Sequence, residues 1–266
     1  MDLSQIKMVV TDMDGTLLNS KHAVSDRFFE LFEELKKRNI VFVAASGRQY
    51  HSIVDKLEAI KDDITVIAEN GALVKNQEKE LLVTPLGNHL SKSLLESVDA
   101  IYGAHAMLCG KYKAYFDEKS IPFLEELKEY YASYEIHESL SGISDEIVKI
   151  AVYHDTSAEE FIYPAMKRFN EQIMVKVSGQ HWVDLNHSKA NKGYALRQVQ
   201  EHFGILEEET LAFGDYNNDL EMLQNARYSF AMENAHPQVK TVANYRTESN
   251  DNYGVERILE KLLKAK

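Results

Sequence analysis

The segment Ile6-Lys7-Met8-Val9-Val10-Thr11-Asp12-Met13-Asp14-Gly15-Thr16 decides the fold, because an apolar run in it ends in two carboxylates and a glycine. The apolar run predicts a buried strand. Residues i and i+2 of an extended chain point to the same side, so Asp12 and Asp14 can converge on one point beyond the strand. Two converging carboxylates call for a cation, and one could then act as nucleophile while the other moves a proton. Gly15 allows a sharp turn there, and Thr16 can offer its hydroxyl and amide to an anion.

Asp-x-Asp-Gly is also ordinary turn chemistry, so a functional interpretation depends on partners from distant segments. A calcium loop of the D-x-D-x-D-G type needs glycine at its sixth position and glutamate at its twelfth. Leu17 and Ala23 occupy those positions. The sequence therefore argues against a calcium loop.

Composition limits the class of protein. With 266 residues, 44% of them hydrophobic, the chain can bury a sizeable core in one large domain or two smaller ones. The net charge of −12, without a basic stripe, argues against a nucleic-acid partner. A small phosphate can still bind if a metal and one or two lysines reverse the field locally. The single cysteine, Cys109, is expected to be a buried structural thiol.

No apolar run approaches the roughly 18 residues of a membrane span, and the N-terminus lacks a signal-peptide pattern. We therefore expect a cytoplasmic protein without a membrane partner. We expect it to be a monomer or a weak homodimer.

Strands and helices alternate in the first and last parts of the chain. Strands are predicted at 6–11, 40–45, 64–68, 210–213, 229–232 and 241–245, and helices at 25–38, 50–60, 192–203, 218–226 and after Gly254. The strands are near-continuous apolar runs, as expected when helices cover both faces of a parallel sheet. This pattern predicts an α/β core formed by residues 1–83 and 188–266.

The amino-acid composition changes between these parts, at residues 84–187, where tyrosines become frequent. An irregular run from Tyr134 to Asp145 precedes a strand at 147–153. A helical stretch at 158–170 contains Pro164, which suits the first turn of a helix starting near Ile162. Further strands are expected at 175–177 and 182–185. We predict an inserted second domain, joined to the core through short segments.

Four polar groups follow predicted strands of the core. They are Asp12 with Asp14, Ser46-Gly47-Arg48, Glu69-Asn70-Gly71 and Gly214-Asp215-Tyr216-Asn217-Asn218-Asp219, and Lys192 opens a helix nearby. In open α/β sheets the ligand binds outside the carboxyl ends of the strands. The coincidence of these groups predicts a site there.

Each residue type in this set fits a phosphate site. Ser46 and the amide of Gly47 can hold an anionic oxygen where a loop enters a helix. Lys192 stands at the end of a helix that disfavours a cation, so a buried lysine aimed at phosphate would explain its position. Asp215 could complete a three-carboxylate site for Mg²⁺. Asn218 and Asp219 could instead be helix caps, and Arg48 could be a ligand or a structural charge.

These segments, in this order, resemble the haloacid dehalogenase superfamily of phosphohydrolases, and in particular its Cof-like branch with a large α/β cap (type IIB). The resemblance covers the whole chain and rests on Asp12-Met13-Asp14-Gly15-Thr16-Leu17-Leu18, Ser46-Gly47-Arg48, Lys192-Gly193 and the run from Gly214 to Asp219, with Glu69-Asn70-Gly71 and Asn234-Ala235 as flanking signatures. Thr11 stands where the family usually has an apolar residue, and 186–191 lack the Pro and Gly often seen before the lysine. Neither departure removes a reacting group.

The resemblance implies a Rossmann-like parallel-sheet core with an inserted α/β cap, and a role for each residue. Asp12 would attack phosphorus and become an aspartyl phosphate, while Asp14 would protonate the leaving oxygen and later activate water. Mg²⁺ would bind Asp12, the backbone carbonyl of Asp14, and Asp215. The phosphoryl oxygens would be held by Ser46, Gly47, Lys192 and Asn218, with Asp219 supporting the metal or the lysine from behind.

We therefore expect a Mg²⁺-dependent phosphomonoester hydrolase acting on a small phosphorylated metabolite, such as a sugar phosphate or a nucleotide cofactor. The cap would act as a lid and contact the leaving group. Tyr112, Tyr115, His181 and Trp182 could contribute to it, although local packing is the favoured explanation for each of them. A sugar phosphomutase of the same superfamily and a noncatalytic phosphometabolite sensor remain as alternatives.

Overall fold

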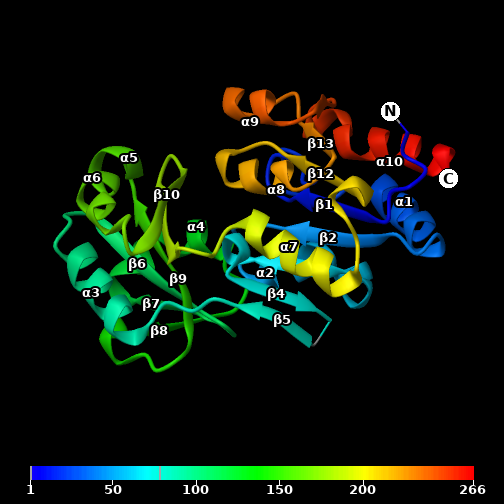
Figure 1. Cartoon of the computed structure of the whole chain (residues 1–266). Coiled ribbons are helices and arrows are strands. Elements are labelled where there is room, and N and C mark those ends of the chain that lie inside the picture. The colour runs from blue at the N-terminus through cyan, green and yellow to red at the C-terminus, as the bar shows by residue number, and fades with distance from the viewer. Residues whose placement is uncertain (1, 78) are drawn as a thin grey trace.

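The computed structural model describes residues 2–77 and 79–266, and within them the strands form two sheets that lie beside each other (Figure 1). The first sheet has the order β14-β13-β12-β1-β2-β3-β4-β5. Its strands are β1 (Met8–Asp12), β2 (Val41–Ala45), β3 (Thr65–Ala68), β4 (Leu73–Asn76), β5 (Lys79–Val83), β12 (Thr210–Gly214), β13 (Tyr228–Ala231) and β14 (Tyr245–Arg246). Both terminal parts of the chain therefore build one sheet.

The second sheet has the order β10-β11-β9-β6-β7-β8 and comes from the middle of the chain. Its strands are β6 (Ala104–Gly110), β7 (Ala114–Asp117), β8 (Tyr134–His137), β9 (Ile147–His154), β10 (Ile173–Gly179) and β11 (Trp182–His187). The α-helices of this part are α3 (Asn88–Asp99), α4 (Leu124–Lys128), α5 (Ala158–Phe161) and α6 (Tyr163–Met166). Together the two parts confirm an α/β fold with a parallel-sheet core and a second sheet.

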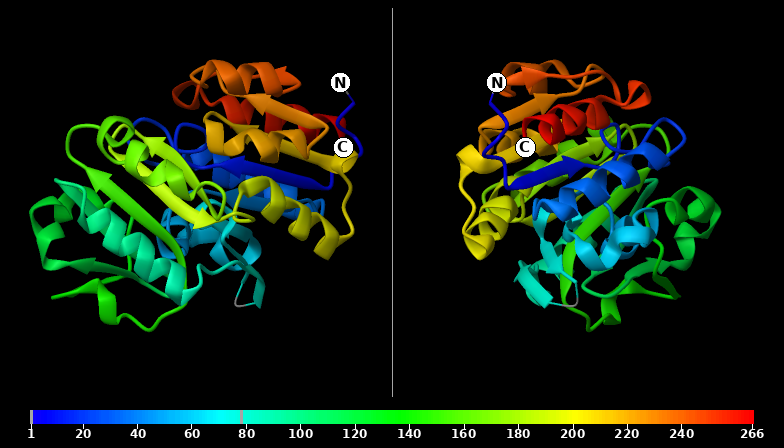
Figure 2. Two further views of the ribbon diagram at one scale, coloured as in Figure 1. Left: turned by 60° about the vertical axis from the view of Figure 1, so that its left-hand side comes forward. Right: turned by 90° about the vertical axis from the view of Figure 1, so that its right-hand side faces the viewer.

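Strand β1 is central and fully buried, and it pairs in parallel with both β2 and β12. Helices α1 (Asp26–Lys37) and α10 (Gly254–Ala265) pack together on one face of the sheet, and α7 (Lys192–Phe203) lies on the other (Figure 2). The remaining helices of the core are α2 (Tyr50–Lys56), α8 (Leu220–Gln224) and α9 (Pro237–Val242). Burial on both faces explains the near-continuous apolar runs of the strands.

The helix boundaries follow the expected local chemistry. The Ser25 side chain accepts from the Phe28 amide at the start of α1, and Asn191 caps α7 in the same way. Helix α7 ends at Gly204, whose φ of 64° lies in the left-handed region. Pro164 is the second residue of α6, as the sequence predicts.

Several predicted elements are wrong or shorter. The strand expected at 241–245 is instead the end of α9, because Pro237 and the capping His236 start a helix, and only Tyr245 and Arg246 pair with β13. The run from Tyr134 to Asp145, expected to be irregular, begins with β8, which pairs in parallel with β7. The predicted helices at 50–60 and 218–226 shorten to α2 and α8, and the stretch at 158–170 divides into α5, α6 and a short 3₁₀ turn.

The antiparallel edge of the first sheet was not predicted. Strand β4 pairs antiparallel with both β3 and β5. The sheet is therefore parallel from β14 to β3 and antiparallel beyond it. A search of the described helices finds none that has both the length and the apolar character needed to cross a membrane.

Candidate active site

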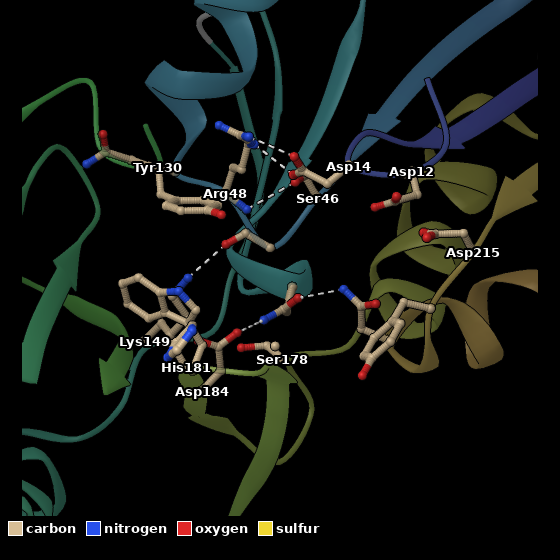
Figure 3. Close-up of a pocket in the computed structure, with 18 of the residues that line it drawn as sticks. Asp12, Asp14, Ser46, Arg48, Tyr130, Lys149, Ser178, His181, Asp184 and Asp215 are labelled. Carbon is tan, nitrogen blue, oxygen red and sulfur yellow. Dashed lines mark hydrogen bonds and ion pairs between the residues drawn. The ribbon is translucent and has the colours of Figure 1, made fainter. Parts of the chain in front are cut away.

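A cavity of about 550 Å³ lies at the carboxyl ends of the core strands, where the second sheet faces them (Figure 3). Asp12, Asp14, Ser46, Gly47, Arg48, Asn70, Asp215 and Asn218 line it from the core. Tyr130, Tyr131, Lys149, Ser178, Gln180, His181, Trp182 and Asp184 line it from the second sheet and its loops. The polar groups that follow different strands therefore meet in one place.

Lys192 lies between two carboxylates. Its Nζ donates to Asp12 Oδ1 at 2.5 Å and to Asp219 Oδ1 at 2.7 Å. The Lys192 side chain is fully buried, and Asp219 likewise. Burial lowers the pKa of Lys192, but the two carboxylates outweigh it and raise that pKa above its ordinary value. Lys192 does not line the cavity itself, but its ammonium group contacts Asp12, which does.

Asp219 holds the loop after β12 in place. Its Oδ2 accepts from the backbone amides of Asp215 at 3.0 Å and Tyr216 at 3.1 Å, while its Oδ1 accepts from Lys192. Both oxygens of Asp219 therefore have donors. The side chain supports Asp215 and Lys192 from behind. It makes no capping bond to α8, although its bond from the Tyr216 amide does cap the short 3₁₀ turn Asn217–Asp219 that precedes this helix.

The carboxylates of Asp12, Asp215 and Asp219 form a cluster whose ligand oxygens lie within 4.8 Å of one another. Burial, followed by the negative charge of Asp219, raises the pKa of Asp215 to about 7. The same causes raise the pKa of Asp12 well above its ordinary value. Carboxylates crowded in this way are stabilised by a second cation, and hard oxygen donors suit Mg²⁺.

Gly15 permits the close approach of the two loops that carry these carboxylates. Its φ is +74°, and a Cβ at this position would collide with the Asp215 carboxylate. The Thr16 hydroxyl donates to Asp215 Oδ1 at 3.3 Å. Because both oxygens of Asp219 are occupied, Asp12 and Asp215 are the members of the cluster that fit a metal ion.

Arg48 holds Asp14 in a bidentate pair. Its Nε donates to Asp14 Oδ2 and its Nη2 to Asp14 Oδ1, both at 2.7 Å (Figure 3). The same guanidinium donates to the backbone carbonyl of Glu129, pairs with the Glu129 carboxylate at 3.2 Å and lies 4.9 Å from the Tyr130 ring centroid. Arg48, whose role the sequence left open, thus joins Asp14 to the second sheet's part of the chain.

The Ser46-Gly47 loop offers unpaired donors to the cavity. Ser46 is buried, and its Oγ accepts from the Arg48 amide at 3.1 Å. The amide of Gly47 has no acceptor among the described residues. Asn218 Nδ2 donates to Asn70 Oδ1 at 3.2 Å. The predicted phosphate ligands Ser46, Gly47 and Asn218 therefore line the same cavity as Asp12.

Sequence reasoning missed several lining residues from the middle of the chain. Lys149, Asp184, Ser178 and Gln180 have no motif or spacing that could have indicated them. His181 and Trp182 were named as candidates and do line the cavity, whereas Tyr112 and Tyr115 are not among the lining residues described. Tyr115 instead donates to Asp145 at 3.0 Å, which is a local contact.

Comparison with known proteins gives one family. The family model of haloacid dehalogenase-like hydrolases matches residues 9–259. The chain is 33% identical over 265 residues to the Escherichia coli K12 protein YbjI, a 5-amino-6-(5-phospho-D-ribitylamino)uracil phosphatase. This match covers 97% of each of the two chains. The structure of SMU.1108c from Streptococcus mutans UA159 superposes with a TM-score of 0.89 at 30% identity, covering 97% of this chain and 99% of that one. The HAD subclass IIB sugar phosphatase BT4131 shares the fold with a TM-score of 0.82 at 21% identity, covering 96% of this chain and 98% of that one.

Proposed function

The chain belongs to the haloacid dehalogenase-like hydrolases and is a phosphatase of phosphorylated small molecules, and on this premise we propose a Mg²⁺-dependent phosphomonoesterase that works through an aspartyl phosphate on Asp12. Family membership confirms the resemblance predicted from the order of the motifs. The observation that carries the proposal is the position of Asp12, which ends the central strand, contacts Lys192 at 2.5 Å and shares a carboxylate cluster with Asp215.

In the proposed reaction Asp12 attacks phosphorus in line. Lys192 holds Oδ1 of Asp12, which leaves the other carboxylate oxygen to form the new bond to phosphorus as the bond to the leaving oxygen breaks. Asp14 enters this step protonated, with one of its oxygens released from the Arg48 pair, and gives that proton to the leaving oxygen. It then takes a proton from the water that attacks the aspartyl phosphate, and inorganic phosphate is released.

The remaining polar groups neutralise and orient the phosphoryl oxygens. Ser46, the Gly47 amide and Asn218 would donate to them from the cavity wall, and Lys192 would balance charge behind Asp12. A Mg²⁺ ion bound by Asp12, the backbone carbonyl of Asp14, and Asp215 would supply the positive charge that the transition state requires. Asp219 keeps Lys192 and the Asp215 loop in place.

The middle of the chain, residues 84–187, would act as a cap on a core made of 1–83 and 188–266. The Thr84 amide donates to Ala72 in the core at 2.8 Å, and the Leu86 amide donates to Ile147 in the second sheet at 2.7 Å. The chain thus leaves the first sheet within two residues. A cap placed over the cavity would exclude water while Asp12 is phosphorylated.

The proposed substrates are small phosphorylated metabolites, for example sugar phosphates, nucleotide cofactors and, by similarity to YbjI, a ribitylaminouracil phosphate. A cavity of about 550 Å³ suits a ligand of this size. Its walls carry both aromatic and hydrogen-bonding side chains, so a leaving group that combines an apolar or ring face with polar substituents fits it.

The test is release of inorganic phosphate from a panel of these esters and an aryl phosphate, with Mg²⁺ or with EDTA. We expect metal-dependent turnover in the wild type and a loss of several orders of magnitude in Asp12→Asn, which removes the nucleophile but little volume. Substantial turnover by Asp12→Asn would refute the assignment. Transfer of the phosphoryl group to a second sugar hydroxyl, without phosphate release, would indicate a mutase.

A further inference from the structure

A buried lysine of the cap contacts the phosphate loop of the core. Lys149 stands on β9, and its side chain is only 4% exposed. Its Nζ donates to the backbone carbonyl of Gly47 at 2.8 Å and lies 2.6 Å from Oε2 of Glu69, a core residue that is 1% exposed. The proposed mechanism leaves this buried ion pair unexplained.

With the Lys149 contact, the backbone carbonyls of three consecutive residues, 46–48, all accept a hydrogen bond. The carbonyl of Ser46 accepts from the Asn70 amide at 3.0 Å, and the carbonyl of Arg48 accepts from the Glu69 amide at 3.0 Å. The carbonyl of Gly47, between them, accepts from Lys149. All three carbonyls of the loop are therefore bonded, whereas the Gly47 amide has no acceptor among the described residues. The Gly47 carbonyl shares its peptide plane with the Arg48 amide, which donates to Ser46 Oγ, so the Lys149 bond fixes the plane that orients the Ser46 hydroxyl. The Gly47 amide lies in the preceding plane, whose Ser46 carbonyl accepts from the Asn70 amide.

A second cap residue fixes the amide of Asn70. Oδ2 of Asp184, on β11, accepts from Asn70 Nδ2 at 2.6 Å. Since a carboxylate only accepts, Asn70 must present its NH₂ group to Asp184 and its Oδ1 to Asn218, whose Nδ2 lies 3.2 Å away. The same Oδ1 lies 2.8 Å from the position that a Cβ on Gly47 would take. The orientation of two proposed phosphate ligands therefore depends on cap residues.

We propose that Lys149 and Asp184 are positioning residues through which the cap sets the phosphate-binding donors of the Ser46-Gly47 loop and of Asn218. The inference rests on the proposed phosphatase function. Under it, the anion site is complete only while the cap is docked, so phosphate is bound tightly only after water has been excluded. Burial of an ion pair adds little stability compared with apolar residues of the same volume, which makes positioning the better account of Lys149 and Glu69.

The experiment measures binding of orthovanadate, which has no leaving group, by isothermal titration calorimetry in Mg²⁺. The variant combines Lys149→Met with Glu69→Gln, so that the Glu69 carboxylate is not left buried without its cation, while the nearby Asp184 keeps its bond from Asn70 Nδ2. Ser52→Ala is the matched control, because Ser52 Oγ donates to the Tyr130 carbonyl at 2.7 Å and accepts from the Ala132 amide at 3.1 Å, a contact between cap and core outside the phosphate loop.

We expect vanadate affinity to fall about 10- to 100-fold in the double variant, as for other groups that orient a ligand-binding residue. The value of kcat/KM should fall by a similar factor for every ester, whatever its leaving group. Ser52→Ala should change neither quantity by more than about threefold. Asp184→Val, which cannot accept from Asn70, should weaken vanadate binding as the double variant does.

Unchanged vanadate affinity in the double variant would overturn the proposal. So would a loss confined to some esters, since Lys149 would then contact the leaving group, and so would an equal loss in Ser52→Ala, which would reflect cap docking in general. A double variant that does not fold would make the pair a structural requirement and would also overturn it. Failure of the wild type to bind vanadate or hydrolyse any ester would instead count against the proposed function.

Discussion

Mg²⁺ binding should weaken steeply as the pH falls through neutrality, because protons compete with the metal for Asp215. In the metal-free protein, burial and the charge of Asp219 raise the pKa of Asp215 to about 7 from an ordinary value of 3.8. Between pH 3.8 and about 7, Asp215 therefore holds a proton in the folded, metal-free protein that it has already lost in the unfolded chain. This contribution to stability is present below pH 3.8 and is lost as the pH rises to about 7.

The size of both effects follows from that pKa. Each pKa unit is about 1.4 kcal/mol, so the metal-free protein loses up to about 4 kcal/mol of stability through this group between about pH 4 and pH 7. At about pH 5.5 only about 3% of Asp215 is ionised, against about 90% at about pH 8. Apparent Mg²⁺ affinity should therefore be about 30-fold weaker at the lower pH, or about 2 kcal/mol. The raised pKa of Asp12 acts in the same direction.

Isothermal titration calorimetry with MgCl₂ across this pH range would measure the affinity directly. Thr16→Val is the informative variant, because the Thr16 hydroxyl bonds Asp215 at 3.3 Å and lowers the pKa of that carboxyl. Its removal should move the pH midpoint of Mg²⁺ binding upward. An affinity that is independent of pH, or a midpoint that moves downward in Thr16→Val, would refute the reasoning.

Three further substitutions test individual parts of the site. Arg48→Lys keeps the charge but loses the bidentate contact with Asp14. Single-turnover phosphorylation should slow about 10-fold or more with alkyl phosphates, and much less with an aryl phosphate, whose leaving group needs little protonation. Equal losses with both esters would contradict a role of Arg48 in placing Asp14. Lys192→Met leaves the buried carboxylates of Asp12 and Asp219 unpaired, and denaturant unfolding should show about 3–5 kcal/mol of destabilisation, which adding Asp219→Asn should partly restore. Gly15→Ala places a Cβ against Asp215, so calorimetry should show weakened Mg²⁺ binding, whereas wild-type affinity would mean that the two loops separate without cost.

The residues at the strand ends were predictable because their positions follow from chain order alone. The apolar runs indicate a parallel sheet, and the carboxyl ends of its strands must meet at one edge. That argument places Asp12, Ser46 and Asp215 together from the sequence alone. It could not place Lys149 or Asp184. Their contacts with Gly47 and Asn70 join strands of the second sheet to loops of the core, across 102 and 114 positions of sequence.

The missed and misread elements have equally local causes. The hairpin of β4 and β5 is short and mixes charged with apolar residues, so it shows neither the continuous apolar run nor the strict alternation that marks a strand. At 241–245 the apolar residues suggested a strand, yet the stronger signal was Pro237 at the first helical position. The role of Arg48 was undecidable because an arginine in a loop is recognised as a clamp only when Asp14 and Glu129 are known to lie on either side of it.

The charges around Asp12 also fix the order in which the proposed site assembles. Four carboxylates, those of Asp12, Asp14, Asp215 and Asp219, face two cations, Lys192 and Arg48, so the formal charge is −4 + 2 = −2 when all are ionised. A phosphate dianion approaching this surface is repelled, and in a buried site water screens that repulsion weakly. One Mg²⁺ ion would bring the formal charge to zero, so the dianion would no longer be repelled and could accept from the Ser46-Gly47 loop and Asn218. Above the pKa of Asp215 we therefore expect metal to bind before phosphate, and the cap to close over the anion only afterwards.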